Sequence, residues 1–316
     1  MPAPTSVSRL NPAAQLGTNI TDATCLDDAL RTAKLDWSVI QRKADNLTLF
    51  ADDDIVTTSI PGKDLLIRSD NNQALGVVGS RYTPVSNADA FSMADAAHRL
   101  GARFAYAGEL DHGRKTFLTM TLPEASISVG GHDLVEFSIK FTTGHAGCAP
   151  ITGEAIGTRL VCTNGMRSSF GTNHKWNIRH TATADHRLEQ AETALQHAFA
   201  YAKEFSAAAE HMISTPMSRR EFTEFIDTLF PEPEEGCTSR KRNLWETRRR
   251  NLLSLFGTYE TQEEGRETRW AGYNSVIEWL DWFRPAQGGE EGRALRNFET
   301  GNDNGLGSRV FELLAS

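Results

Sequence analysis

Apolar and polar residues alternate most strictly over Leu134–Thr143. Such alternation is typical of a strand with one buried and one polar face. The polar face of this strand carries Lys140, so we expect the sheet to present water or a ligand there. Two preceding segments, Arg103–Leu110 and Lys115–Leu122, flank a short turn that contains glycine and predict a hairpin. A further strand is expected at Gly157–Cys162, after a loop.

Helical spacing precedes and follows these strands. A helix is predicted to begin at Asn87, which would cap it, and to end at Gly101. A much longer helix is predicted after residue 187, because apolar residues recur there at intervals of three and four. The residues of this seam are Leu188, Ala191, Leu195, Ala198, Ala202, Phe205, Ala209 and Met212. The seam predicts a homo-oligomer, although the packing partner can equally belong to the same chain.

The order helix, three strands and long helix predicts an α+β fold with a mixed or antiparallel sheet. Residues 1–24 are small and polar, and we expect a flexible N-terminal arm. Residues 25–215 would form the α+β core domain. Residues 216–316, which begin at Pro216 and contain further prolines and an acidic loop, would form a mostly helical C-terminal region. The aromatic stripe Trp270–Phe283 in this region is interpreted as core.

Composition narrows the class of protein. The 316 residues include 33 Lys and Arg against 41 Asp and Glu, a net charge of −8, which allows a local basic groove but not a uniformly basic surface. No apolar run is long enough to span a bilayer and no signal peptide is present, so we expect a soluble protein of the bacterial cytoplasm without membrane contact. The four cysteines form no CxxC pair and are expected to be free thiols.

Motifs for enzymatic chemistry are largely missing from the sequence. The chain has no phosphate loop of the GxxxxGK type, no GxGxxG, no GxSxG and no HExxH. His145, Cys148 and Cys162 are the best enzyme candidate, since they could supply metal ligands or a nucleophile. The alternative is a glycine-rich turn beside a buried cysteine. We therefore assign no catalytic residue, metal or cofactor.

Basic residues carry the stronger functional signal. The stretch Arg167–Arg187 interleaves cations with Trp176 and three histidines, and cations neutralise phosphates while aromatic rings stack on bases. The alternative is a solvated connector. The predicted nucleic-acid-binding residues are Lys140, Arg167, Lys175, Trp176, Arg179, His180 and Arg187. A secondary basic cluster, which can also be a surface helix, comprises Arg240, Lys241, Arg242, Arg248, Arg249 and Arg250.

Several short segments, in order, resemble the uncharacterised "phage/plasmid-like protein" family, a domain of unknown function from phages, plasmids and bacterial genomes. They are AKLDW from Ala33, IRSD from Ile67, LGVVGSRY from Leu75, AGEL from Ala107, RLVCTN from Arg159, RHT from Arg179 and WAGYN from Trp270. The chain departs from the family at Ala146, where an acidic residue is expected, and at Gly165-Met166. The resemblance implies a mobile-element origin.

The predicted order of elements is similar to the core of phage single-strand annealing proteins, an analogy of architecture. The expected function is therefore single-stranded DNA binding and annealing, in recombination or replication, without catalytic turnover. The alternative is an interaction protein that binds and inhibits a host factor such as a defence system. A metal- or thiol-dependent enzyme built on His145, Cys148 and Cys162 is a third hypothesis. The expected partners are single-stranded DNA, further copies of the chain, or a host protein.

Overall fold

The computed structural model describes residues 11–45, 47–51, 54–147, 149–160, 164–166, 175–178, 184–299 and 305–316. Its centre is a seven-stranded sheet in which β1, β7, β8, β9 and β10 follow one another, and β11 and β12 pair with different parts of β10. All the pairings in this sheet are antiparallel. The strands are β1 (Thr18–Asn19), β7 (Arg103–Leu110), β8 (Lys115–Val129), β9 (Asp133–Gly144), β10 (Ile151–Arg159), β11 (Asn164–Met166) and β12 (Lys175–Ile178).

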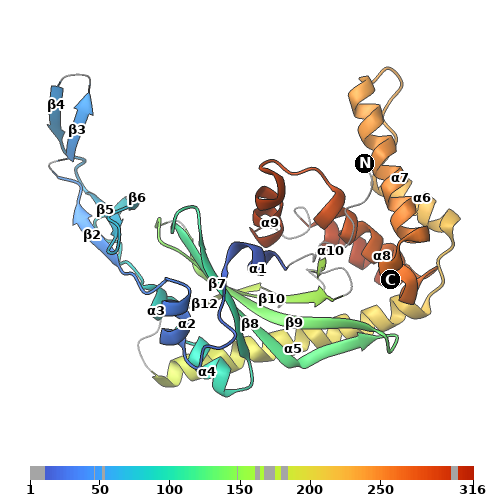
Figure 1. Cartoon of the computed structure of the whole chain (residues 1–316), viewed down its shortest axis with the longest axis horizontal. Coiled ribbons are helices and arrows are strands. Elements are labelled where there is room, and N and C mark those ends of the chain that lie inside the picture. Colours follow the sequence, from blue (N-terminus) through green and yellow to red (C-terminus); the bar gives the residue numbers. More distant parts are fainter. Residues whose placement is uncertain are drawn as a thin grey trace.

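The helix α5 (Ala184–Ser214) lies along the apolar face of this sheet (Figure 1). The residues of its seam from Ala191 to Met212 are buried in the main core, together with Phe137 and Ile139 of β9. The predicted strands and long helix, and with them the α+β class, are confirmed. Because the seam is covered within the chain, it no longer supports a homo-oligomer, which stays a prediction.

The strand expected at Gly157–Cys162 begins earlier than predicted. β10 starts at Ile151, and its residues Gly153 and Ala155 share the face that packs towards α5. A Cβ on Gly153 would come within 2.5 Å of the Trp176 ring. The pattern missed this part of the strand because its buried face is built from small residues, which give a weak apolar signal.

The helix predicted to begin at Asn87 is two short helices, α3 (Asn87–Ala90) and α4 (Ala94–Arg99). Ser86 caps α3, because its hydroxyl accepts a hydrogen bond from the Asp89 N–H. The predicted cap was therefore wrong by one residue. The amide of Asn87 is instead buried and donates to the Leu35 carbonyl.

Residues 11–24 differ from the expected flexible arm. They contain α1 (Pro12–Leu16) and β1, and β1 adds to the sheet beside β7. This approach requires glycine at two positions: a Cβ on Gly17 would lie 2.8 Å from the Ala107 oxygen, and a Cβ on Gly108 would lie 2.9 Å from Gly17. The rest of the expected arm, residues 1–10, lies outside the described residues.

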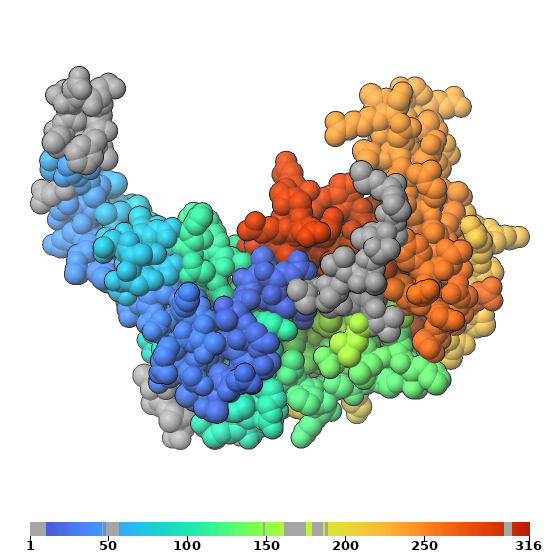
Figure 2. Space-filling model, in the orientation of Figure 1, coloured from blue at the N-terminus to red at the C-terminus, as the bar shows by residue number. Residues whose placement is uncertain are grey.

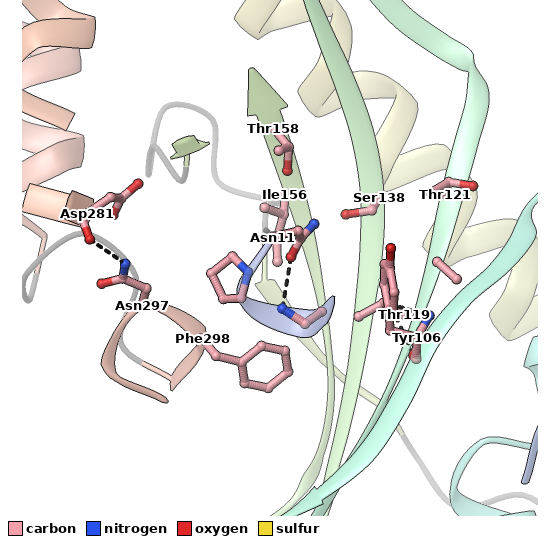
Figure 3. A pocket seen from close by; sticks show the side chains of 13 residues that line it. Asn11, Tyr106, Thr119, Thr121, Ser138, Ile156, Thr158, Asp281, Asn297 and Phe298 are labelled. Carbon is pink, nitrogen blue, oxygen red and sulfur yellow. Dashed lines mark hydrogen bonds between the residues drawn. The ribbon is translucent and has the colours of Figure 1, made fainter. Parts of the chain in front are cut away.

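The polar face of the sheet is partly covered by α1 and by α9 (Gly289–Glu299), as Figure 1 shows. Ala13, Leu110, Phe117 and Phe298 form a small apolar cluster there, separate from the main core. Beside the cluster is a cavity of about 50 Å³, which is lined by hydroxyl-bearing residues of the sheet and by Asn297 and Phe298 of α9 (Figure 3).

Two small sheets project from the body. The β-extension consists of β2 (Val39–Lys43), β5 (Lys63–Arg68) and β6 (Ala74–Gly79), with the hairpin of β3 (Leu47–Ala51) and β4 (Asp54–Thr58) beyond them. Figures 1 and 2 show it standing away from the main sheet. Trp37, Leu66, Leu75 and Val78 form its own apolar cluster. The helix α2 (Leu26–Thr32) lies before β2 and belongs to the main core.

The C-terminal region is mostly helical, as predicted. It contains α6 (Arg219–Leu229), α7 (Ser239–Thr258), a 3-10 turn (Glu260–Gly265), α8 (Arg269–Glu278), a π-helical turn (Trp279–Phe283), α9 and α10 (Leu306–Ala315). α8 and α10 contact α5, and Trp270, Tyr273 and Ile277 are completely buried in the main core. The interpretation of the aromatic stripe as core is confirmed. Within the described part of the chain, no helix is long and apolar enough to cross a membrane.

Candidate functional site

The polar face of the sheet contains an open groove of about 570 Å³ beyond the end of α9. Strand register explains its lining. Lys140 of β9 faces Glu154 of β10, which in turn faces Lys175 of β12. In the next row of the same face, Thr142, Thr152 and Asn177 lie side by side. Lys115 of β8 and Glu299 of α9 complete the rim. The groove therefore combines lysines and glutamates with hydrogen-bonding hydroxyl and amide groups.

The lysines of this groove differ strongly in environment. Lys140 is 4% exposed; its Nζ lies 2.7 Å from Glu154 and donates to the Phe298 carbonyl at 2.8 Å. Lys140 was expected on an open face, and that expectation was wrong because α9 covers it. Lys115 is paired with Glu299 at 2.5 Å, but its side chain is 48% exposed. Lys175 is exposed to solvent at the rim.

The structure separates two residues that were expected to act together. Lys175 and Trp176 are neighbours on β12, and side chains alternate along a strand, so they face opposite sides of the sheet. Trp176 packs against Gly153 and against the ring of His197 on α5, with centroids 5.4 Å apart. Its indole is thus part of the α5 side and does not line the groove.

The other predicted residues of this stretch cannot be placed beside the groove. Arg167, Arg179 and His180 lie outside the described residues. Arg187 belongs to α5, but its side chain is outside the described part of the structure. Of the predicted nucleic-acid-binding residues, the described groove brings together Lys140 and Lys175. It adds Lys115, which strand alternation could have indicated, and Glu299, for which the sequence gives no local signal.

The secondary basic cluster lies on α7, and half of it is engaged in packing. Arg249 forms two hydrogen bonds to Asp227 of α6, at 2.8 and 3.0 Å, and this pairing raises the pKa of its guanidinium. Arg242 pairs with Glu232, and Arg248 lies 4.6 Å above the Phe230 ring. Arg240, Lys241 and Arg250 are exposed. The cluster therefore holds α7 to its neighbours as much as it offers charge to solvent.

His145, the centre of the enzyme hypothesis, is a buried core residue. Its Nε2 lies 2.8 Å from Asn87 Oδ1, an atom that also accepts a hydrogen bond from Thr116. Burial lowers the pKa of His145 to about 4, and the nearby charge of Arg68 acts in the same direction. Cys148 and Cys162 lie outside the described residues, and no group of three potential metal ligands occurs among the residues described. The imidazole is therefore neutral and held in place at neutral pH.

A second buried network joins the sheet to the C-terminal helices. The Arg159 Nε lies 2.6 Å from Asp133 Oδ2, and the same oxygen accepts a hydrogen bond of 2.7 Å from Trp270 Nε1. Arg159 Nη1 also donates to Gln262, at 3.3 Å. Arg159 and Trp270 begin two of the segments that carry the family resemblance. These two distant segments thus meet at one buried carboxylate, that of Asp133.

A comparison with models of protein families finds a match over most of the chain. The family model described as a domain of unknown function, DUF932, matches residues 74–300. This range contains every groove residue named above, together with Asp133, Arg159 and Trp270. No curated protein and no solved structure matches the chain significantly. The expectation of an uncharacterised family is confirmed: the chain belongs to the DUF932 family.

Proposed function

We propose that this protein binds single-stranded DNA in the lysine-lined groove and promotes strand annealing without catalytic turnover. The observation that carries the proposal is that strand pairing brings Lys140 and Lys175 to one groove and that Lys115 joins them there. Cations gathered along an open groove are the feature that follows a phosphate backbone. In line with the resemblance, we place this activity in recombination or replication of a phage or plasmid.

The architecture supports the same proposal by analogy. The elements α4, β7, β8, β9 and α5 occur in the same order as in the core of phage annealing proteins, with β10, β11 and β12 inserted before α5, and α5 lies across one face of the sheet. The strands β10, β11 and β12 extend this arrangement. β10 and β12 supply Glu154 and Lys175, so the extension is the part that builds the far wall of the groove.

The groove favours contacts to the backbone over contacts to bases. Lys175 is open to solvent. Among the described residues, Lys115 is held by an exposed ion pair with Glu299, so both lysines can reach phosphates. Lys140 is buried and its charge is paired with that of Glu154, so we expect no direct contact between Lys140 and a phosphate. Phe298, the aromatic residue of the lining, is only 3% exposed and offers no face for stacking. We therefore expect binding that depends little on base sequence.

The test is the salt dependence of binding, measured by fluorescence anisotropy with a labelled single-stranded oligonucleotide. Two phosphate contacts predict that log affinity falls with log salt at a slope of about −1.4. Lys175→Ala should reduce the magnitude of this slope by about 0.7. Lys203→Ala is the matched control, because Lys203 is an exposed lysine of α5, on the other side of the sheet.

A fluorescence assay with two complementary strands then tests annealing, and the protein should accelerate pairing without added nucleotide. If the wild-type protein shows no salt-sensitive binding, or if Lys175→Ala and Lys203→Ala behave alike, the groove is not a DNA site. The proposal would then give way to an interaction protein that binds a host factor.

A further inference from the structure

The C-terminal end of α9 places its negative groups on the two groove lysines of β8 and β9. The Glu299 carboxylate accepts a hydrogen bond from Lys115 Nζ, and the carbonyl of Phe298 accepts one from Lys140 Nζ. The Lys140 ammonium also lies 4.7 Å from the centre of the Phe298 ring. A single helix end therefore binds the ammonium groups of both lysines, and at Lys115 it does so with a carboxylate.

The position of Glu299 is unfavourable for the helix itself. The carbonyl end of a helix carries a partial negative charge, so a cation is favoured there and a carboxylate is disfavoured. Glu299 is the last residue of α9, whereas Glu290 and Glu291 lie in its first turn, where acidic residues are favoured. Lys115 compensates for the charge of Glu299. The favourable interaction of Glu299 thus comes from Lys115 in the groove and not from its position in the helix.

The ion pairs of Lys140 and Lys115 differ in how easily another anion could replace the carboxylate. Lys140 and Glu154 have side chains only 5% and 10% exposed, so this pair is fixed inside the protein. Lys115 and Glu299 are 48% and 33% exposed, and an ion pair of this kind is weak in water. Replacement of the Glu299 carboxylate by an anionic ligand is therefore easier at Lys115 than replacement of Glu154 at Lys140.

Exchange at Lys115 does not require α9 to leave the sheet. Phe298 is packed against Phe117, with ring centroids 4.4 Å apart. Asn297 donates to the Asp281 carbonyl at 3.1 Å, and Arg296 donates to the Leu280 carbonyl at 2.9 Å. These contacts anchor the last turn from its inner side. Rotation of the Glu299 side chain alone would release Lys115.

We propose that Lys115 is a phosphate subsite which Glu299 occupies in the free protein and which a DNA phosphate takes over on binding. The inference rests on the proposed function, since it names the regulation of the same groove. Glu299 acts as an internal competitor for the subsite. A single anion would gain little by displacing it, whereas a strand that also contacts Lys175 binds at two points. The groove would therefore discriminate in favour of polyanions.

The experiment compares Glu299→Gln with Glu290→Gln by the same anisotropy titration. Both changes remove one carboxylate from α9, but Glu290 is an exposed residue of the first turn and does not line the groove. Glu299→Gln should bind single-stranded DNA about two- to fivefold more tightly than wild type, the range expected for the loss of an exposed competing pair. Glu290→Gln should change affinity by less than this.

Lys115→Gln provides the second arm. If Glu299 acts through Lys115, then the gain from Glu299→Gln should disappear in the Lys115→Gln background. Equal gains in Glu299→Gln and Glu290→Gln, or a gain that persists without Lys115, would overturn the competitor role and leave DNA binding intact. Salt-independent or absent binding by wild type would instead overturn the proposed function. Circular dichroism on each variant verifies that the fold is retained.

Discussion

The buried pair of Arg159 and Asp133 permits the sharpest prediction about stability. Their side chains are 1% and 0% exposed, and the Arg159 Nε lies 2.6 Å from Asp133 Oδ2. Replacing Arg159 by methionine keeps much of the side-chain volume but leaves the carboxylate buried with Trp270 as its remaining hydrogen-bond donor. Breaking a buried pair in this way costs about 3–5 kcal/mol. That is a large fraction of the roughly 5–15 kcal/mol that stabilises a typical domain.

The assay is urea unfolding followed by far-UV circular dichroism for Arg159→Met, Asp133→Leu and the double variant. The double variant removes both charges, so it should be more stable than the sum of the single effects implies, by at least about 2 kcal/mol. Arg220→Met is the control, because the Arg220–Glu224 pair is 87% and 64% exposed. It should change stability by less than about 0.5 kcal/mol. Additive single effects, or a loss below about 1 kcal/mol in Arg159→Met, would refute the reasoning.

Two further predictions concern His145 and Trp176. The pKa of His145 falls from its ordinary 6.5 to about 4 in the folded protein, so between these values the unfolded chain binds more protons. Stability should therefore decrease as pH falls from 6.5 towards 4, by up to about 1.4 kcal/mol per pH unit, and urea midpoints for His145→Gln should show a weaker dependence. An unchanged pH profile in this variant would contradict the assignment. Trp176→Ala should lower stability by about 1–3 kcal/mol, because its half-buried ring packs on α5. It should leave the salt slope and affinity for DNA close to wild type; a large loss of affinity in a folded variant would show that Trp176 contacts DNA after all.

Much of the central fold could be predicted from local pattern. Period-two alternation identified β9, and spacing by three and four identified α5, because each element buries one face along its whole length. The start of β10 and the elements α1 and β1 could not be found in this way. The start of β10 buries Gly153 and Ala155, α1 buries only Ala13, and both residues of β1 are exposed, so these segments carry little apolar signal.

The candidate site was predicted less completely than the fold. Lys140 and Lys175 were singled out as basic residues, and the structure places both at the groove. The grouping of Lys175 with Trp176 did not hold, since neighbouring residues on a strand face opposite sides of the sheet. Lys115 and Glu299 are 184 positions apart in the chain, so no motif could link them.

The sequence by itself determined the main elements of the core, such as β9 and α5, since their formation depends on the spacing of apolar side chains along a short stretch of chain. It also determined where positive charge is available. Only the tertiary structure decided which of these charges remain exposed to solvent. The helix α9 covers Lys140, leaves Lys175 exposed and pairs Lys115 with the side chain of its last residue, Glu299. The physical reason is that burial and charge pairing depend on the element that arrives from elsewhere in the chain, and not on the residues beside the lysine.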